Sequence, residues 1–138
     1  MAFGRDIQYT VSVCIADPQA DKTLPIWRVP AEITKIEILE AWVVSDTALS
    51  AGTANGRECT LLDGGADASG TSAISNTVGG TDAGGTFAAW TASTPKAFTI
   101  SEGTLDGGDY VNFKYEETGT DAPKNLLVWF AYVSGVGA

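Results

Sequence analysis

Residues 125–133, NLLVWFAYV, constrain the fold of this chain more than any other stretch. All but the first are apolar, and such a run is too short to span a membrane and short for a helix that is stable by itself. Its β-branched and aromatic residues favour a strand that is covered on both faces. The sequence therefore predicts a buried β-strand near the C-terminal end.

A second strand comes just before this run. Residues 109–115 alternate cleanly, with Val111, Phe113 and Tyr115 on one parity, and a period of two is typical of a half-buried strand. The loop between the two strands, residues 116–124, contains Thr-Gly-Thr and Asp-Ala-Pro, which are turn formers. We expect the two strands to form a central hairpin against which the rest of the chain packs.

Short apolar runs bounded by turn residues predict strands elsewhere too, at residues 9–15, 25–30, 31–44, 57–63, 72–76, 86–90 and 96–101. The piece at 25–30 is bracketed by prolines, which cannot donate to a ladder, so it belongs at a sheet edge. In 31–44 a helix is the rival, because Ile33, Ile36 and Glu40 also suit helical spacing. The β-branched density favours a strand, and Glu40 on the parity of Ile36, Ile38, Trp42 and Val44 indicates a bulge or burial on both faces.

The strand count predicts the fold class. With 138 residues and 16 glycines, the chain suits one all-β domain with many turns. Eight or nine short antiparallel strands favour a single-domain β-sandwich of jelly-roll-like type. We expect a flexible arm at 1–8, the sandwich at 9–133 with a Gly/Ser/Thr-rich insert at 64–85, and a flexible tail at 134–138.

Charge and composition argue against several function classes. The net charge of −9 disfavours nucleic-acid binding through phosphate neutralisation. The chain has no histidine, which removes the commonest general base and the commonest zinc ligand. No signal peptide and no run of transmembrane length is apparent, so we expect a chain that is made in a cytoplasm and does not bind membranes.

The two cysteines and the loop acids offer little chemistry. Cys14 and Cys59 match no metal spacing, and two free thiols are favoured over a disulfide. Asp63, Asp67 and Asp82 lie in Gly-rich loops, but DGGADASG lacks the alternating ligands and closing Glu of a calcium loop, so we interpret them as turn acids.

A glycosidase pair at Glu116 and Glu117 is disfavoured, because adjacent strand residues point to opposite faces. No catalytic residue, metal or cofactor is therefore expected.

The tryptophans are the remaining signal. A sugar-stacking platform is one interpretation, and packing in the core or at a subunit interface is the commoner fate of tryptophan in a small sandwich. Leu127, Trp129 and Ala131 share one parity of the last strand, and we expect a neighbouring subunit to cover that side. With Trp27 and Arg28 of the edge segment they form the candidate oligomer or capsid interface.

The order of the pieces carries a resemblance. The chain runs ITKIEILEAWVV, NGRECTLLDGG, a Gly/Ser/Thr-rich crossing, FAAWTASTPKAFTIS, LDGGDYVNFKYEETG and APKNLLVWFAYV. This order resembles the jelly-roll-like head decoration proteins, and related capsid-associated structural proteins, of tailed bacteriophages. The resemblance covers residues 33–133. Residues 1–29 lie outside it and are the candidate attachment segment.

The resemblance implies a non-enzymatic virion protein on the outer capsid surface, often a trimer at local three-fold positions. Its partner would be the major capsid protein, which it would clamp against the pressure of packaged DNA, without metal or cofactor. The alternative is a carbohydrate- or receptor-binding module of a virion fibre. An enzyme is the third class, and the missing histidine argues against it.

Overall fold

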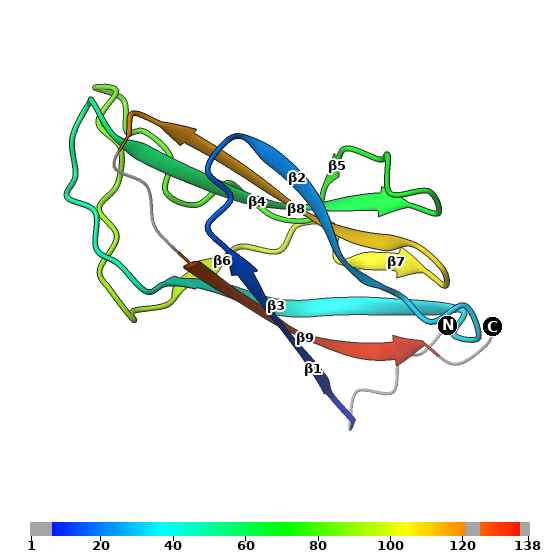
Figure 1. Cartoon of the computed structure of the whole chain (residues 1–138). Helices are drawn as coiled ribbons and strands as arrows, with labels where there is room; N and C mark the ends of the chain where they lie inside the picture. Colours follow the sequence, from blue (N-terminus) through cyan, green and yellow to red (C-terminus); the bar gives the residue numbers. More distant parts are fainter. Residues whose placement is uncertain (1–6, 121–124, 136–138) are drawn as a thin grey trace.

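The computed structural model describes residues 7–120 and 125–135, which form two antiparallel β-sheets packed face to face (Figure 1). Sheet A has the order β1-β9-β3-β6, and β7 also pairs with β3. Its strands are β1 (Tyr9–Ala16), β3 (Lys35–Ser45), β6 (Lys96–Phe98), β7 (Thr104–Asp106) and β9 (Asn125–Gly135). Sheet B has the order β2-β8-β4-β5, with β2 (Lys22–Arg28), β4 (Gly56–Gly65), β5 (Ser72–Ala73) and β8 (Tyr110–Thr118).

The pairing is that of a jelly roll. With β7 set aside, the first strand pairs with the last, β1 with β9, and the next pairs inward are β2 with β8, β3 with β6 and β4 with β5. These are the ladders of one long hairpin, which wraps so that β9 also pairs with β3 and β8 with β4. The nine strands confirm the predicted all-β sandwich.

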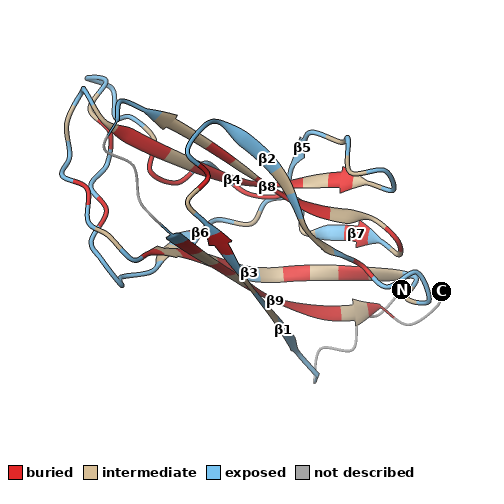
Figure 2. Ribbon diagram, viewed as in Figure 1, coloured by how far each residue is buried: buried red, intermediate tan, exposed pale blue. Residues whose placement is uncertain are grey.

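Alternation along each strand builds the core between the sheets. In β9, Leu126, Val128 and Phe130 point inward and are buried, and in β8 the inward residues are Val111, Phe113 and Tyr115. Figure 2 shows the buried positions concentrated on the long strands β3, β4, β8 and β9. These four are the inner strands of the two sheets, which explains why their sequences read as the most apolar runs.

The predicted central hairpin is wrong. Strands β8 and β9 follow each other in the chain, but β8 lies in sheet B between β2 and β4, whereas β9 lies in sheet A between β1 and β3. Each is therefore central to its own sheet, and the segment that joins them crosses from one sheet to the other. Loop length alone does not distinguish such a crossing from a hairpin loop.

Several boundaries also differ from the sequence-based expectation. Strand β3 begins at Lys35, after a turn at 31–34, and β2 begins earlier than expected, at Lys22. Residues 86–90 form only isolated bridges, at Phe87 and Trp90. Strand β7 lies at 104–106, where no strand was expected, and β9 continues to Gly135, two residues into the expected tail.

The Gly/Ser/Thr-rich insert at 64–85 packs partly into the core. It begins within β4 and includes β5, and Ile74 and Val78 are buried. Ile74 donates its N–H to the carbonyl of Leu61 at 2.9 Å, and its own carbonyl accepts from the N–H of Ser101 at 2.9 Å. The two apolar residues of the insert thus hold it against the sandwich.

Candidate functional site

The outer face of sheet A carries two rows of mostly apolar side chains, which we call the tryptophan face. Strand registers place the first row at Ser12, Trp129, Trp42 and Ala97 and the second at Cys14, Leu127 and Val44. Their chain neighbours Val13, Val128 and Val43 point to the core, so these residues point outward. No charged side chain lies in either row.

A pair of stacked indoles lies at the centre of this face. Trp42 of β3 and Trp129 of β9 are directly opposite each other, with ring centroids 4.0 Å apart and planes 19° apart. Both residues are half-buried, although no described segment pairs with this side of the sheet. Mutual stacking brings one face of each ring against the other, and the parts of the two rings that remain exposed contribute apolar surface to the outer side of the sheet.

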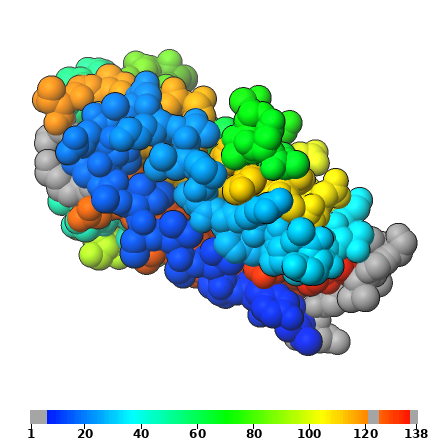
Figure 3. Space-filling model, turned by 45° about the vertical axis from the view of Figure 1, so that its right-hand side comes forward, coloured from blue at the N-terminus to red at the C-terminus, as the bar shows by residue number. Residues whose placement is uncertain are grey.

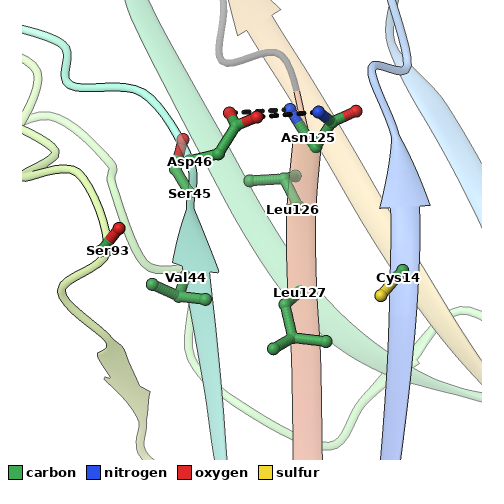
Figure 4. Close-up of a pocket in the computed structure, with 8 residues that line it drawn as sticks. All are labelled: Cys14, Val44, Ser45, Asp46, Ser93, Asn125, Leu126 and Leu127. Atoms are coloured by element: carbon green, nitrogen blue, oxygen red, sulfur yellow. Dashed lines mark hydrogen bonds between the residues drawn. The ribbon is translucent and has the colours of Figure 1, made fainter.

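A shallow pocket of about 290 Å³ lies at the end of the second row, where β1, β9 and β3 run side by side (Figure 4). Cys14, Leu127 and Val44 supply its apolar wall. At its rim, the Asp46 carboxylate accepts hydrogen bonds from the backbone N–H of Asn125 at 3.1 Å and from its side-chain amide at 2.7 Å. These bonds lower the pKa of Asp46. The pocket thus joins an apolar floor to one fixed carboxylate.

The structure divides the five predicted interface residues among three places. Leu127, Trp129 and Ala131 share the outer face of β9, but Ala131 is only 4% exposed, so Trp129 and Leu127 provide the accessible surface. Trp27 packs between the sheets, with its ring 5.0 Å from Tyr132. Arg28 lies at the edge of sheet B, where its Nε donates to the carbonyl of Gly108 at 3.0 Å.

Two members of the tryptophan face, Trp42 and Val44, were expected on the parity of Ile36 and Ile38. The register against β9 shifts between Ile38 and Glu40, and this bulge reverses the alternation, so Ile36 and Ile38 point inward while Trp42 and Val44 point outward. Glu40 on the apolar parity was the sequence signal for the bulge. If Glu40 is interpreted as the point where β3 changes face, the sequence places Trp42 and Val44 on the outer side.

Asp67 and Asp82 shape turns, as predicted, whereas Asp63 lies in β4, where its Oδ1 accepts from the N–H of Gly65 at 2.9 Å. Asp67 Oδ1 accepts from the N–H and hydroxyl of Ser69 at 3.0 and 2.6 Å, which lowers the pKa of Asp67. Asp82 Oδ1 accepts from the backbone N–H groups of Gly84 and Thr86 at 2.8 and 3.0 Å. Among the residues that the structure describes, no three His, Cys, Asp or Glu side chains are grouped so as to hold a metal ion.

Neither cysteine is placed as a nucleophile. Both thiols are free; Cys14 is exposed on the outer face of β1, and Cys59 is buried. Burial raises the pKa of Cys59 and disfavours its thiolate.

The adjacent acids Glu116 and Glu117 point apart, as expected. Glu116 forms an ion pair with Lys114 at 2.9 Å, and Glu117 accepts from the Tyr115 hydroxyl at 3.0 Å.

Among the described residues, one charged side chain is buried in the sandwich interior, where its role is structural. Arg57 of β4 is 1% exposed; its guanidinium donates to the Ser45 hydroxyl at 3.2 Å and lies 5.6 Å from the centroid of the Trp90 ring. Lys96 also approaches this ring, at 5.2 Å. Trp90 therefore serves the core, through contacts with cations, rather than a binding surface.

Comparison with known proteins adds no family to this geometry: no family model matches the chain, and no curated protein matches its sequence. In the described part of the chain, no helix is present that could cross a membrane.

Proposed function

We propose that the chain is a structural protein of a tailed-bacteriophage virion that decorates the outer capsid surface and stabilises the shell. Its partner in this role is the major capsid protein, and it needs neither metal nor cofactor. Two features support the proposal: the resemblance in the order of the strands, and a jelly-roll fold, which recurs in viral capsid domains. Because one fold serves many functions, the fold supports this role only by analogy, and the main support must come from the residues of the site.

The observation that carries the proposal is the difference between the outer faces of the two sheets. On sheet B, β8 presents Lys114 and Glu116 in an ion pair, and Glu58 of β4 lies opposite Glu116. On sheet A, the corresponding rows present Trp42, Trp129 and other uncharged side chains. Glu40, also on the outer side of β3, lies one row away from Trp42. An antiparallel sheet that faces water on one side normally has polar residues there, so the apolar patch formed by the two rows is suited to be covered by a protein surface.

The net charge of the chain and the repetition of one contact over a shell also support the proposal. The net charge of −9 suits a docking surface that is basic around an apolar centre. Each contact can be weak, because a contact that repeats over a whole shell adds up to a large stabilisation. A protein that binds only the assembled shell shifts the equilibrium toward assembly.

Co-sedimentation with empty capsids tests this role. The capsids are assembled from the major capsid protein encoded in the same genome as the chain, and the variant Trp129→Lys is compared with Thr23→Lys, an exposed position on β2 of sheet B. We expect wild type and Thr23→Lys to bind the shells and raise their unfolding temperature, and Trp129→Lys to lose binding while keeping its β-sheet circular dichroism. Wild-type protein that stays in the supernatant would refute the capsid role.

A carbohydrate-binding module is the second candidate, because Trp42 and Trp129 lie beside the polar side chains of Ser12 and Glu40. Partly exposed aromatic rings with polar neighbours suit a sugar ring. Glycan-array binding that disappears in Trp129→Lys and persists in Thr23→Lys would favour this function. Shell binding without glycan binding would favour the capsid role.

A further inference from the structure

Strand β1 forms an unprotected edge of sheet A. Its sequence, YTVSVCIA, contains no charged residue and no proline, and its register against β9 is continuous over all eight residues. Among the described residues, its backbone hydrogen bonds go only to β9. Every second N–H and C=O of β1 therefore points away from β9 without a partner among these residues. Strand β1 lies on the surface in the dark blue region of Figure 3.

The other edge strands carry devices that block pairing with a further strand. Strand β2 contains Pro25, has a bulge between Pro25 and Trp27, and carries Lys22 and Arg28 at its ends. Strands β5, β6 and β7 have only two or three residues each, and Lys96 begins β6. Charges, prolines, bulges and short length are the usual protection of sheet edges. Among the described strands, only β1 lacks all of them.

The surroundings of β1 are apolar as well. The two residues with the most exposed large apolar side chains, Ile7 at 61% and Tyr9 at 47%, lie just before and at its start. On its inner side, Val13 faces Leu24 and Ile26 across a shallow groove of about 390 Å³ between β1 and β2. All three are only half-buried. The edge and the groove form one continuous strip.

We propose that β1 pairs antiparallel with β1 of a second copy of this chain, which joins the two A sheets into one. The partner edge must itself be unprotected, and β1 is the edge that meets this condition. The strand is self-complementary: when Ser12 lies opposite Ser12 of the second copy, Val11 lies opposite Val13, and Thr10 opposite Cys14. Valines then meet on the inner face and small polar side chains on the outer face.

Charge favours this strip over other contacts between copies. Two molecules that each carry −9 repel, but a strand without charged residues brings no like charges into direct opposition. The strip is small compared with a standard interface, which uses roughly 20–30 residues on each side. The dimer is therefore weak in solution, and its population depends on protein concentration.

The proposal goes beyond the capsid role and does not depend on it. Pairing of β1 with itself is isologous and gives a two-fold assembly, whereas the resemblance to decoration proteins implies a trimer. Two-fold pairing would also place two tryptophan faces on the same side of a continuous sheet.

Sedimentation velocity of the purified chain, from low to high micromolar concentration and without capsids, tests the proposal. Ser12 is exposed at the middle of β1, so Ser12→Lys and Ser12→Glu each place two like charges close together across the pair. The matched control is Thr23→Lys, an exposed position in the protected edge β2. Thermal unfolding of each variant checks that the fold is retained.

We expect the average mass of wild type and Thr23→Lys to rise toward twice that of the chain, and each Ser12 variant to remain a monomer. An equimolar mixture of Ser12→Lys and Ser12→Glu should recover the dimer, because opposite charges then meet. A wild-type monomer at all concentrations, a trimer, or Ser12 variants that associate like wild type would each overturn the proposal. Because no shell is present, none of these outcomes bears on capsid binding.

Discussion

Replacement of Ile74 by alanine tests whether the Gly/Ser/Thr-rich insert is part of the cooperative core. The Ile74 side chain is fully buried, next to β5, and packs in the same cluster as the residues of the two sheets. Ile74→Ala removes three carbons, each worth about 0.8 kcal/mol when buried, or about 2.4 kcal/mol in total. The cavity left behind brings the expected loss of unfolding free energy to about 2–5 kcal/mol.

This loss is a large part of the roughly 5–15 kcal/mol that a domain of this kind has available. Urea denaturation followed by tryptophan fluorescence measures it as a lower midpoint with an unchanged slope. Ile74→Val, which removes one methyl group, should cost only about 0.5–1.5 kcal/mol. Ser72→Ala, at an exposed position in the same segment, should change stability by less than about 0.5 kcal/mol.

A loss below about 1 kcal/mol for Ile74→Ala would refute this reasoning, because a fully buried isoleucine in a cooperative core costs more. Hydrogen exchange would then show whether the insert unfolds separately from the two sheets. Loss of protection confined to the insert and its partner near Ser101 would mean that this segment opens separately from the sandwich.

Three further predictions concern other parts of the structure. Gly79→Ala should lower the free energy of unfolding by about 1–3 kcal/mol or more, because φ is +79° and a Cβ there would collide with the backbone carbonyl oxygen of Arg57. Gly85→Ala, with φ +80° and open space around it, should lower the free energy of unfolding by less, and an equal loss in denaturant titrations would contradict this. Either Trp42→Ala or Trp129→Ala should abolish the exciton signal of the stacked indoles in circular dichroism, and a signal that survives would mean that they do not stack. The lowered pKa of Asp46 should contribute stability that is complete above the ordinary pKa of 3.8 and is lost as the pH falls through the lower pKa of the folded state. A pKa at or above 3.8 for Asp46, measured by NMR titration, would contradict its hydrogen bonds to Asn125.

The candidate site was predictable in part. The outward parity of Leu127 and Trp129 follows from alternation along one apolar strand, and the structure places both on the outer face of sheet A. Their partners Trp42 and Val44 were not predictable in this way, because one bulge reverses the alternation of β3. Trp27 was assigned to the candidate interface, but it packs between the sheets from the edge strand β2, against Phe130 and Tyr132.

The sequence by itself determined the local structure of this protein. Alternation or a short apolar run rich in β-branched residues predicts the long strands, and prolines mark the edge strand β2. Asp67 and Asp82 mark turns that their own side chains close. These features depend on neighbours within a few residues along the chain, so the sequence displays them directly.

Only the tertiary structure decided which strands pair and which faces are covered. Strands β8 and β9 are neighbours in the chain, yet they lie in different sheets, because β9 finds β1 and β3 as partners and β8 finds β2 and β4. Pairing between distant segments is selected by packing of the whole core, which no local pattern records. The bulge in β3 and the unprotected edge of β1 follow from that pairing. For this reason the sequence indicated only the β9 part of the tryptophan face, whereas its β3 part and the free edge of β1 became visible only in the folded chain.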